Sequence, residues 1–284
     1  PIYGFLLSGS VCQEAGVRAL GRALGVDLRR SLLSGAFFLT VALMLAWMCF
    51  NSAHYLFNPA MWSQISAPKM LFIATCTSLG LAPLLFAIAT VPYAWSFLQD
   101  RESGFENQAV ERVGFWAYGF AKVLSVALSA FLAAAVSIGL FVGALFLLGL
   151  PETQPALEGG EGYLGFAASG HTVGYYLARI TITGLSCSLA SVFGLMMTAI
   201  IRNVFVGLLA PLVGYYLYSV LHAVVSLATH SLWITQAFRL SGILFYQAFE
   251  DPGFSFLWSS VVMLTMTALC AKGFLGRLRK EQGL

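Results

Sequence analysis

Charged residues are scarce in this chain of 284 residues: 10% of its positions are charged, whereas 59% are hydrophobic. A soluble domain usually carries about 25% charged residues, because its surface must be solvated by water. A soluble enzyme is therefore not expected. Because a membrane-spanning helix needs about 20 apolar residues, the chain has room for several crossings. The composition predicts an all-α integral membrane protein.

The motifs of catalysis and of ion-driven transport are also missing. No P-loop occurs, since none of the four lysines is followed by serine or threonine. There is no HExxH motif, and the five cysteines form no CxxC pair. The long apolar runs contain no Asp or Glu, the residues that proton- or sodium-coupled carriers usually place inside the membrane. We expect no enzymatic activity, metal site or cofactor in this chain; a sodium site made of backbone carbonyls stays open.

Six apolar runs predict one transmembrane domain over residues 1–284, with spans at 32–50, 70–97, 117–148, 173–201, 204–228 and 254–271. Pro83 and Pro92 should kink the second span. Residues 10–30 mix apolar side chains with arginines, which predicts an amphipathic elbow helix on the inner membrane surface; an ordinary basic flank is the alternative. The external segment 229–253 is apolar and predicts a re-entrant or interfacial helical hairpin.

The basic residues predict the orientation, because Lys and Arg accumulate in cytoplasmic loops. If the N-terminus is inside, twelve of them fall on the cytoplasmic side: Arg18, Arg22, Arg29, Arg30, Arg101, Arg112, Lys122, Arg202, Lys272, Arg277, Arg279 and Lys280. Three fall outside: Lys69, Arg179 and Arg239. Lys122 is expected at the inner interface, with its ammonium reaching lipid phosphate. Both termini are therefore predicted to be cytoplasmic.

A repeat of small residues lies in the third run, where Ala135, Gly139 and Gly143 recur every four positions. Small residues at this spacing allow two helices to approach closely. Two interpretations stay open: packing within the chain, or contact with another copy of it.

The segment 98–116, between the second and third runs, is the most charged part of the chain. Around it the sequence VPYAWSFLQDRESGFENQAVERVGFWAYGFAKVL contains a pattern made by Pro92, Tyr93, Asp100, Glu102, Ser103, Gly104, Arg112, Tyr118 and Lys122. This pattern resembles permease subunits of bacterial ABC transporters of the type-2 exporter class, similar to lantibiotic-immunity and antibiotic-export permeases. VDLRRSLLSGAFFLTVALML looks like the elbow of that family, and IIRNVFVGLLAPLVGYYL looks like its tight inner turn.

The resemblance implies that 98–116 is a coupling helix docking on a separate cytosolic P-loop ATPase, which binds ATP and magnesium. The residues to which it assigns this coupling are Asp100, Arg101, Glu102, Gly104, Phe105, Glu106, Ala109 and Arg112. Phe105, Ala109 and Val113 are four apart and should share one helix face. A solvated loop with topology-setting charges is the alternative.

The same resemblance implies a second permease copy or a sister permease, each chain forming half of a translocation path across the bacterial cytoplasmic membrane. No nucleic-acid partner is expected, since the net charge is only +3. Few polar residues occur in the spans, which favours an amphipathic or lipid-like cargo. The residues expected to line the path are Trp47, Phe50, Tyr215, Tyr216 and Tyr218.

Two other functions remain open at the level of sequence. A non-transporting membrane scaffold or sensor would recruit a cytosolic partner through the same charged segment. An ion-independent facilitator would need no ATPase, and changes within 100–112 would leave its flux intact.

Overall fold

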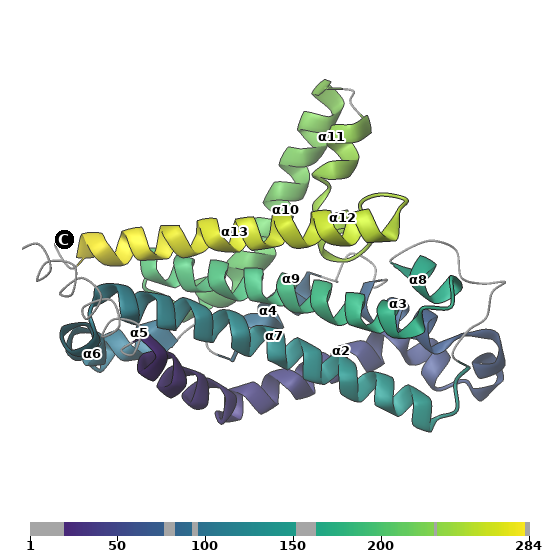
Figure 1. Ribbon diagram of the computed structural model, residues 1–284, viewed down its shortest axis with the longest axis horizontal. Coiled ribbons are helices and arrows are strands. Elements are labelled where there is room, and N and C mark those ends of the chain that lie inside the picture. The colour runs from purple at the N-terminus through teal and green to yellow at the C-terminus, as the bar shows by residue number, and fades with distance from the viewer. Residues whose placement is uncertain (1–19, 77–82, 93–95, 152–162, 230–231, 282–284) are drawn as a thin grey trace, which may run out of the picture.

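The chain is an all-helical, multi-pass bundle in a computed structural model that describes residues 20–76, 83–92, 96–151, 163–229 and 232–281, with no strand among them (Figure 1). Five helices are long and apolar enough to cross a membrane. They are α2 (Gly35–Leu56), α7 (Phe115–Leu147), α9 (Thr172–Ile200), α10 (Val204–Thr229) and α13 (Pro252–Glu281). The expected membrane protein and its helical class are confirmed at this level.

The second expected span, 70–97, does not form one continuous helix. It is divided among α3 (Ala67–Cys76), α4 (Leu84–Thr90) and α5 (Ser96–Glu102). Pro83 directly precedes α4, and Pro92 lies beyond its end. Proline lacks a backbone donor and disfavours helix in the preceding residue, so Pro83 is tolerated at the start of α4, and Pro92 follows the end of that helix.

Helix α9 is the centre of the bundle and packs against α7, α10, α13 and α4. Its serines face neighbouring backbones: Ser188 donates to the Ala127 carbonyl at 2.8 Å, and Ser191 donates to the Ala89 carbonyl at 2.7 Å. These bonds satisfy hydroxyls that hydrocarbon could not solvate, and they tie α9 to α7 and α4.

Two glycines allow α9 and α10 to touch. A Cβ placed on Gly194 would lie 2.6 Å from the Gly207 carbonyl oxygen, and one on Gly207 would clash with Thr198. Gly139 and Gly143, by contrast, have nothing within 4 Å of such a Cβ. The interpretation of their repeat as packing within the chain is therefore wrong for these two glycines.

The segment expected as an external hairpin contains two short helices, α11 (Leu232–Ala237) and α12 (Leu240–Leu244). The outer part of α10 and α11 project together from the bundle (Figure 1). Helix α12 turns inward, and Ile243, Leu244 and Phe245 are buried in the main core. Entry of this segment into the membrane stays a prediction.

The remaining helices complete the two ends of the bundle. Residues 20–32 are helical, as the elbow prediction requires, whereas 10–19 lie outside the described residues. Ser34 then caps α2, accepting a hydrogen bond from the Phe37 amide at 3.2 Å. The other short helices are η1 (Pro59–Gln64), α6 (Phe105–Val113) and α8 (Leu164–Ala168).

Candidate functional site

The charged segment 98–116 folds into α5 and α6 and lies at the same end of the bundle as the C-terminal part of α13 (Figure 1). Gly104 joins α5 to α6 with φ +70°, and Gly114 joins α6 to α7 with φ +87°. Both backbones adopt conformations that side-chain-bearing residues rarely accept. Helix α6 (Phe105–Val113) is thus a short segment between two glycine turns, and we call it the arm. Gly114 is not among the residues that the sequence predicts for this site.

A cluster of charged side chains fastens this arm to the bundle. Lys122 of α7 contacts Asp100 of α5 at 2.5 Å and Asp27 of the segment 20–32 at 3.6 Å. Arg30 contacts the other oxygen of Asp100 at 2.8 Å. Tyr118 donates to Asp100 at 3.4 Å. The segment 20–32, α5 and α7 therefore meet through five side chains. We call these residues the arm anchor: Asp27, Arg30, Asp100, Tyr118 and Lys122.

The two carboxylates and the lysine of the anchor are buried. Lys122 and Asp100 are 0% exposed and Asp27 is 7% exposed, whereas the Arg30 side chain is half-exposed. A buried charge is tolerated only when it is paired and hydrogen-bonded. The expectation that Lys122 reaches lipid phosphate is wrong, because its ammonium is enclosed by these carboxylates. The sequence pattern that indicates such a pairing is a single lysine in an apolar run directly after a segment with several carboxylates.

The residues proposed for coupling divide into two groups in the structure. Asp100 and Glu106 are buried, which leaves neither carboxylate on the surface. Glu102 and Arg112 are exposed, and Arg101 and Gly104 are half-buried. The outward charges of the arm are therefore contributed by Glu102, Glu111 and Arg112, residues that α5 and α6 hold apart from the anchor.

The expected apolar face of α6 is also divided. Phe105 is 43% exposed, whereas Ala109, Val110 and Val113 pack against a core formed by α7, α9 and α13. These three side chains position the arm against its own bundle. Phe105, at the start of α6, is exposed and offers an apolar contact to another molecule, whereas these three side chains are half-buried.

A second buried charge lies near the opposite end of the bundle. Arg179 of α9 is 1% exposed; it donates to the Phe245 carbonyl at 2.7 Å, to the Thr75 hydroxyl and to Cys76 Sγ at 2.8 Å. It thereby links α9 to α3 and to the residue that follows α12. The sequence counts Arg179 among the basic residues of the external side; the structure buries its side chain within the bundle, and its side of the membrane stays a prediction. Without Arg179, Lys122 and Arg18, which lies outside the described residues, ten basic residues remain of those counted on the cytoplasmic side and two of those counted outside.

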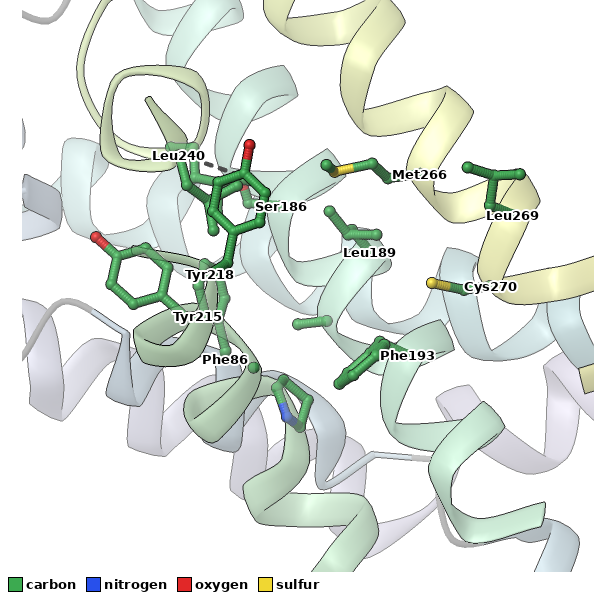
Figure 2. A pocket seen from close by; sticks show the side chains of 14 residues that line it. Phe86, Ser186, Leu189, Phe193, Tyr215, Tyr218, Leu240, Met266, Leu269 and Cys270 are labelled. Carbon is green, nitrogen blue, oxygen red and sulfur yellow. Dashed lines mark hydrogen bonds between the residues drawn. The ribbon is translucent and has the colours of Figure 1, made fainter. Parts of the chain in front are cut away.

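An apolar cavity of about 280 Å³ lies beside α9 (Figure 2). Residues of α4, α9, α10, α12 and α13 line it: Phe86, Ser186, Leu189, Ala190, Phe193, Pro211, Gly214, Tyr215, Tyr218, Leu240, Leu244, Met266, Leu269 and Cys270. Two of its polar groups have partners: the Tyr218 hydroxyl donates to the Phe238 carbonyl at 3.0 Å, and the Ser186 hydroxyl donates to the Ile182 carbonyl at 2.8 Å. This chemistry suits a hydrocarbon group rather than a sugar or an ion.

Two of the five aromatic residues predicted for a transport path, Tyr215 and Tyr218, line this cavity. Trp47 stacks on Phe50 on α2, with ring centroids 6.1 Å apart, and Phe50 is 67% exposed. Tyr216 is 45% exposed and does not line the cavity. Adjacent helical positions point in different directions, so a run of tyrosines cannot all face one space.

No group of three or more metal-ligating side chains occurs within the described parts of the chain. Comparisons with protein-family models, with curated proteins and with solved structures found no match.

Proposed function

We propose that this chain is the membrane-spanning subunit of an ATP-driven exporter similar to type-2 ABC permeases, forming half of a translocation path. A separate cytosolic P-loop ATPase would bind ATP and magnesium and hydrolyse the nucleotide. A second permease, identical or related, would complete the path in a bacterial cytoplasmic membrane. Catalysis would reside wholly in the ATPase partner.

The observation that carries this proposal is the combination of an exposed arm with a buried anchor. Helix α6 presents Glu111 and Arg112 outward between two glycine turns. The preceding helix α5 is fixed to α7 through Asp100 and Lys122. A force applied to such an arm would pass into a spanning helix and the elbow together, which is what coupling to an external motor requires.

The six-span topology and both cytoplasmic termini belong to this proposal. Helices α3 and α4 would together form a discontinuous second crossing. Met70, Leu71 and Ala74 of α3 are fully buried, and Ala89 of α4 is too. This burial supports a broken crossing surrounded by protein, because an irregular backbone facing lipid would leave polar groups unsatisfied.

The cavity beside α9 supports an apolar cargo. Phe86, Tyr215 and Tyr218 would contact the apolar portion of an amphipathic or lipid-like compound as it passes between α4 and α10. The exposed aromatic residues Phe50 and Tyr216 would face lipid or the second permease.

The test is a detergent purification of the chain from its native membrane, with identification of co-purifying proteins and an assay of ATP hydrolysis. We expect a P-loop ATPase to be recovered and its activity to depend on this chain. Arg112→Glu should reduce recovery of the ATPase several-fold, because it reverses an exposed charge on the arm while leaving the anchor intact.

Lys280→Glu is the matched control, since it reverses an exposed charge at the same end of the bundle but on the C-terminal turn of α13 and not on the arm. Equal losses for both variants would show a general charge effect and contradict docking through α6. Preparations free of ATPase in two detergents would overturn the exporter and leave the scaffold or the facilitator.

A further inference from the structure

A long groove runs along the outside of the bundle, between α7 and α13 with α9 as its floor. Its volume is about 870 Å³, and its lining is almost wholly apolar, including Phe120, Leu128, Leu185 and Leu264. Ser188 and Thr267 also line it, but their hydroxyls donate to the Ala127 and Met263 carbonyls. The apolar part of the groove therefore offers no polar group that needs a ligand.

The length of this apolar part matches one leaflet of a bilayer. Leu264 and Lys272 both line the groove on α13. Eight residues of helix span about 12 Å at 1.5 Å per residue. Half of a hydrocarbon core of about 30 Å is about 15 Å, close to that length. Because all three surrounding helices are candidate membrane spans, hydrocarbon chains are the molecules that reach this groove.

One end of the groove is basic. Lys272 and Arg279 line it, are exposed and lie two turns apart on the same face of α13. Trp116 lies at the same end on α7 and is 58% exposed, the position at which tryptophan meets lipid headgroups. A Cβ on Gly276, between the two cations, would have nothing within 4 Å, so this end of the groove is open.

We infer that the α7–α13 groove binds an anionic phospholipid, with acyl chains along α7 and α13 and the phosphate between Lys272 and Arg279. The positive charge at the basic end of the groove favours this ligand, because basic pockets between spans attract anionic headgroups. A second copy related by two-fold symmetry would present the same basic end, and like charges would oppose each other. The inference does not depend on coupling to an ATPase.

The test measures lipid retention by native mass spectrometry of the full chain, using phosphatidylglycerol and phosphatidylcholine with identical acyl chains. The wild type should retain phosphatidylglycerol preferentially. Lys272→Gln combined with Arg279→Gln should weaken its binding about 30-fold, at about fivefold per cation. Lys280→Gln combined with Arg22→Gln is the matched control, because it removes two exposed cations from residues that do not line the groove.

Ala271→Trp tests the acyl part separately, since a large ring at this lining position would occupy the groove. It should reduce retention of both lipids, with the thermal midpoint of the protein showing that the bundle stays folded. Equal retention of the two lipids by the wild type, or equal losses in the two double variants, would overturn the inference. Disulfide cross-linking of two chains through Ala271→Cys would place a second copy in the groove instead.

Discussion

At the scale of single residues, Lys122 and Arg179 are the most informative side chains, because a membrane protein keeps a buried charge only where partners enclose it. Lys122 is matched by Asp100 and Asp27, and it connects parts of the chain that are 22 and 95 positions away in sequence. Arg179 instead relies on a carbonyl, a hydroxyl and a thiol. The first is an electrostatic anchor, and the second is a hydrogen-bonded junction.

Replacing Lys122 by Met should lower the free energy of unfolding by about 3–5 kcal/mol, because it leaves two carboxylates buried without their shared cation. The measurement is unfolding of the purified chain in detergent. Adding Asp100→Leu to Lys122→Met should recover part of the loss, since it removes the carboxylate nearest to the missing cation.

Lys280→Met provides the control, because Lys280 is an exposed lysine and surface changes usually cost less than about 0.5 kcal/mol. Similar stabilities for Lys122→Met and Lys280→Met would show that the buried anchor contributes nothing to the fold.

At the scale of elements, two features define the bundle. One is a close contact between two helices, and the other is an apolar run that is divided into separate helices. Helices α9 and α10 meet at Gly194 and Gly207, where no side chain fits. The interrupted apolar run is divided into α3, α4 and α5, with Pro83 directly before α4 and Pro92 after its end. The sequence indicated the prolines, but it did not indicate that the resulting pieces would be enclosed by α2, α7 and α9.

Gly194→Val should destabilise the chain by about 1–3 kcal/mol, because its Cβ would clash with the Gly207 carbonyl, a backbone atom that cannot rotate away. The measurement is the shift of the thermal midpoint in detergent. Gly139→Val is the matched control: it makes the same change inside a spanning helix with nothing within 4 Å. A Gly139→Val shift as large as that of Gly194→Val would mean that helix propensity, not the crossing, sets the cost.

At the scale of the whole molecule, the two ends of the bundle differ in chemistry. The arm, the segment 20–32 and the C-terminal part of α13 gather at one end, where most of the basic residues lie; α8 and the start of α9 lie at the other end (Figure 1). This separation follows the asymmetry from which a cytoplasmic arm was predicted.

Labelling of single cysteines in a cysteine-free background tests that orientation. Ser169→Cys, in the turn after α8, should react with a membrane-impermeant maleimide on intact cells, whereas Glu111→Cys on α6 should react only after permeabilisation. Both positions are exposed, so accessibility within the bundle does not limit either reaction. The opposite pattern would invert the topology and remove the arm from the cytoplasm.

The sequence by itself determined the class of protein and five of the long helices, and it indicated the prolines of the second run, although as kinks in one span. These depend on local properties: run length, apolar composition and proline. The charged segment 98–116 was likewise visible from composition, and the anchor residue Asp100 was already among its candidates.

Only the tertiary structure decided which charges face outward. It buried Asp100 and Glu106, enclosed Lys122 and placed Arg179 in the core. It also brought Tyr215 and Tyr218, but not Tyr216, to one cavity, and it left Gly139 and Gly143 without a neighbour. Pairing and burial are set by the rotation of each helix and by contacts between residues far apart in sequence, and neither quantity is encoded in a local pattern.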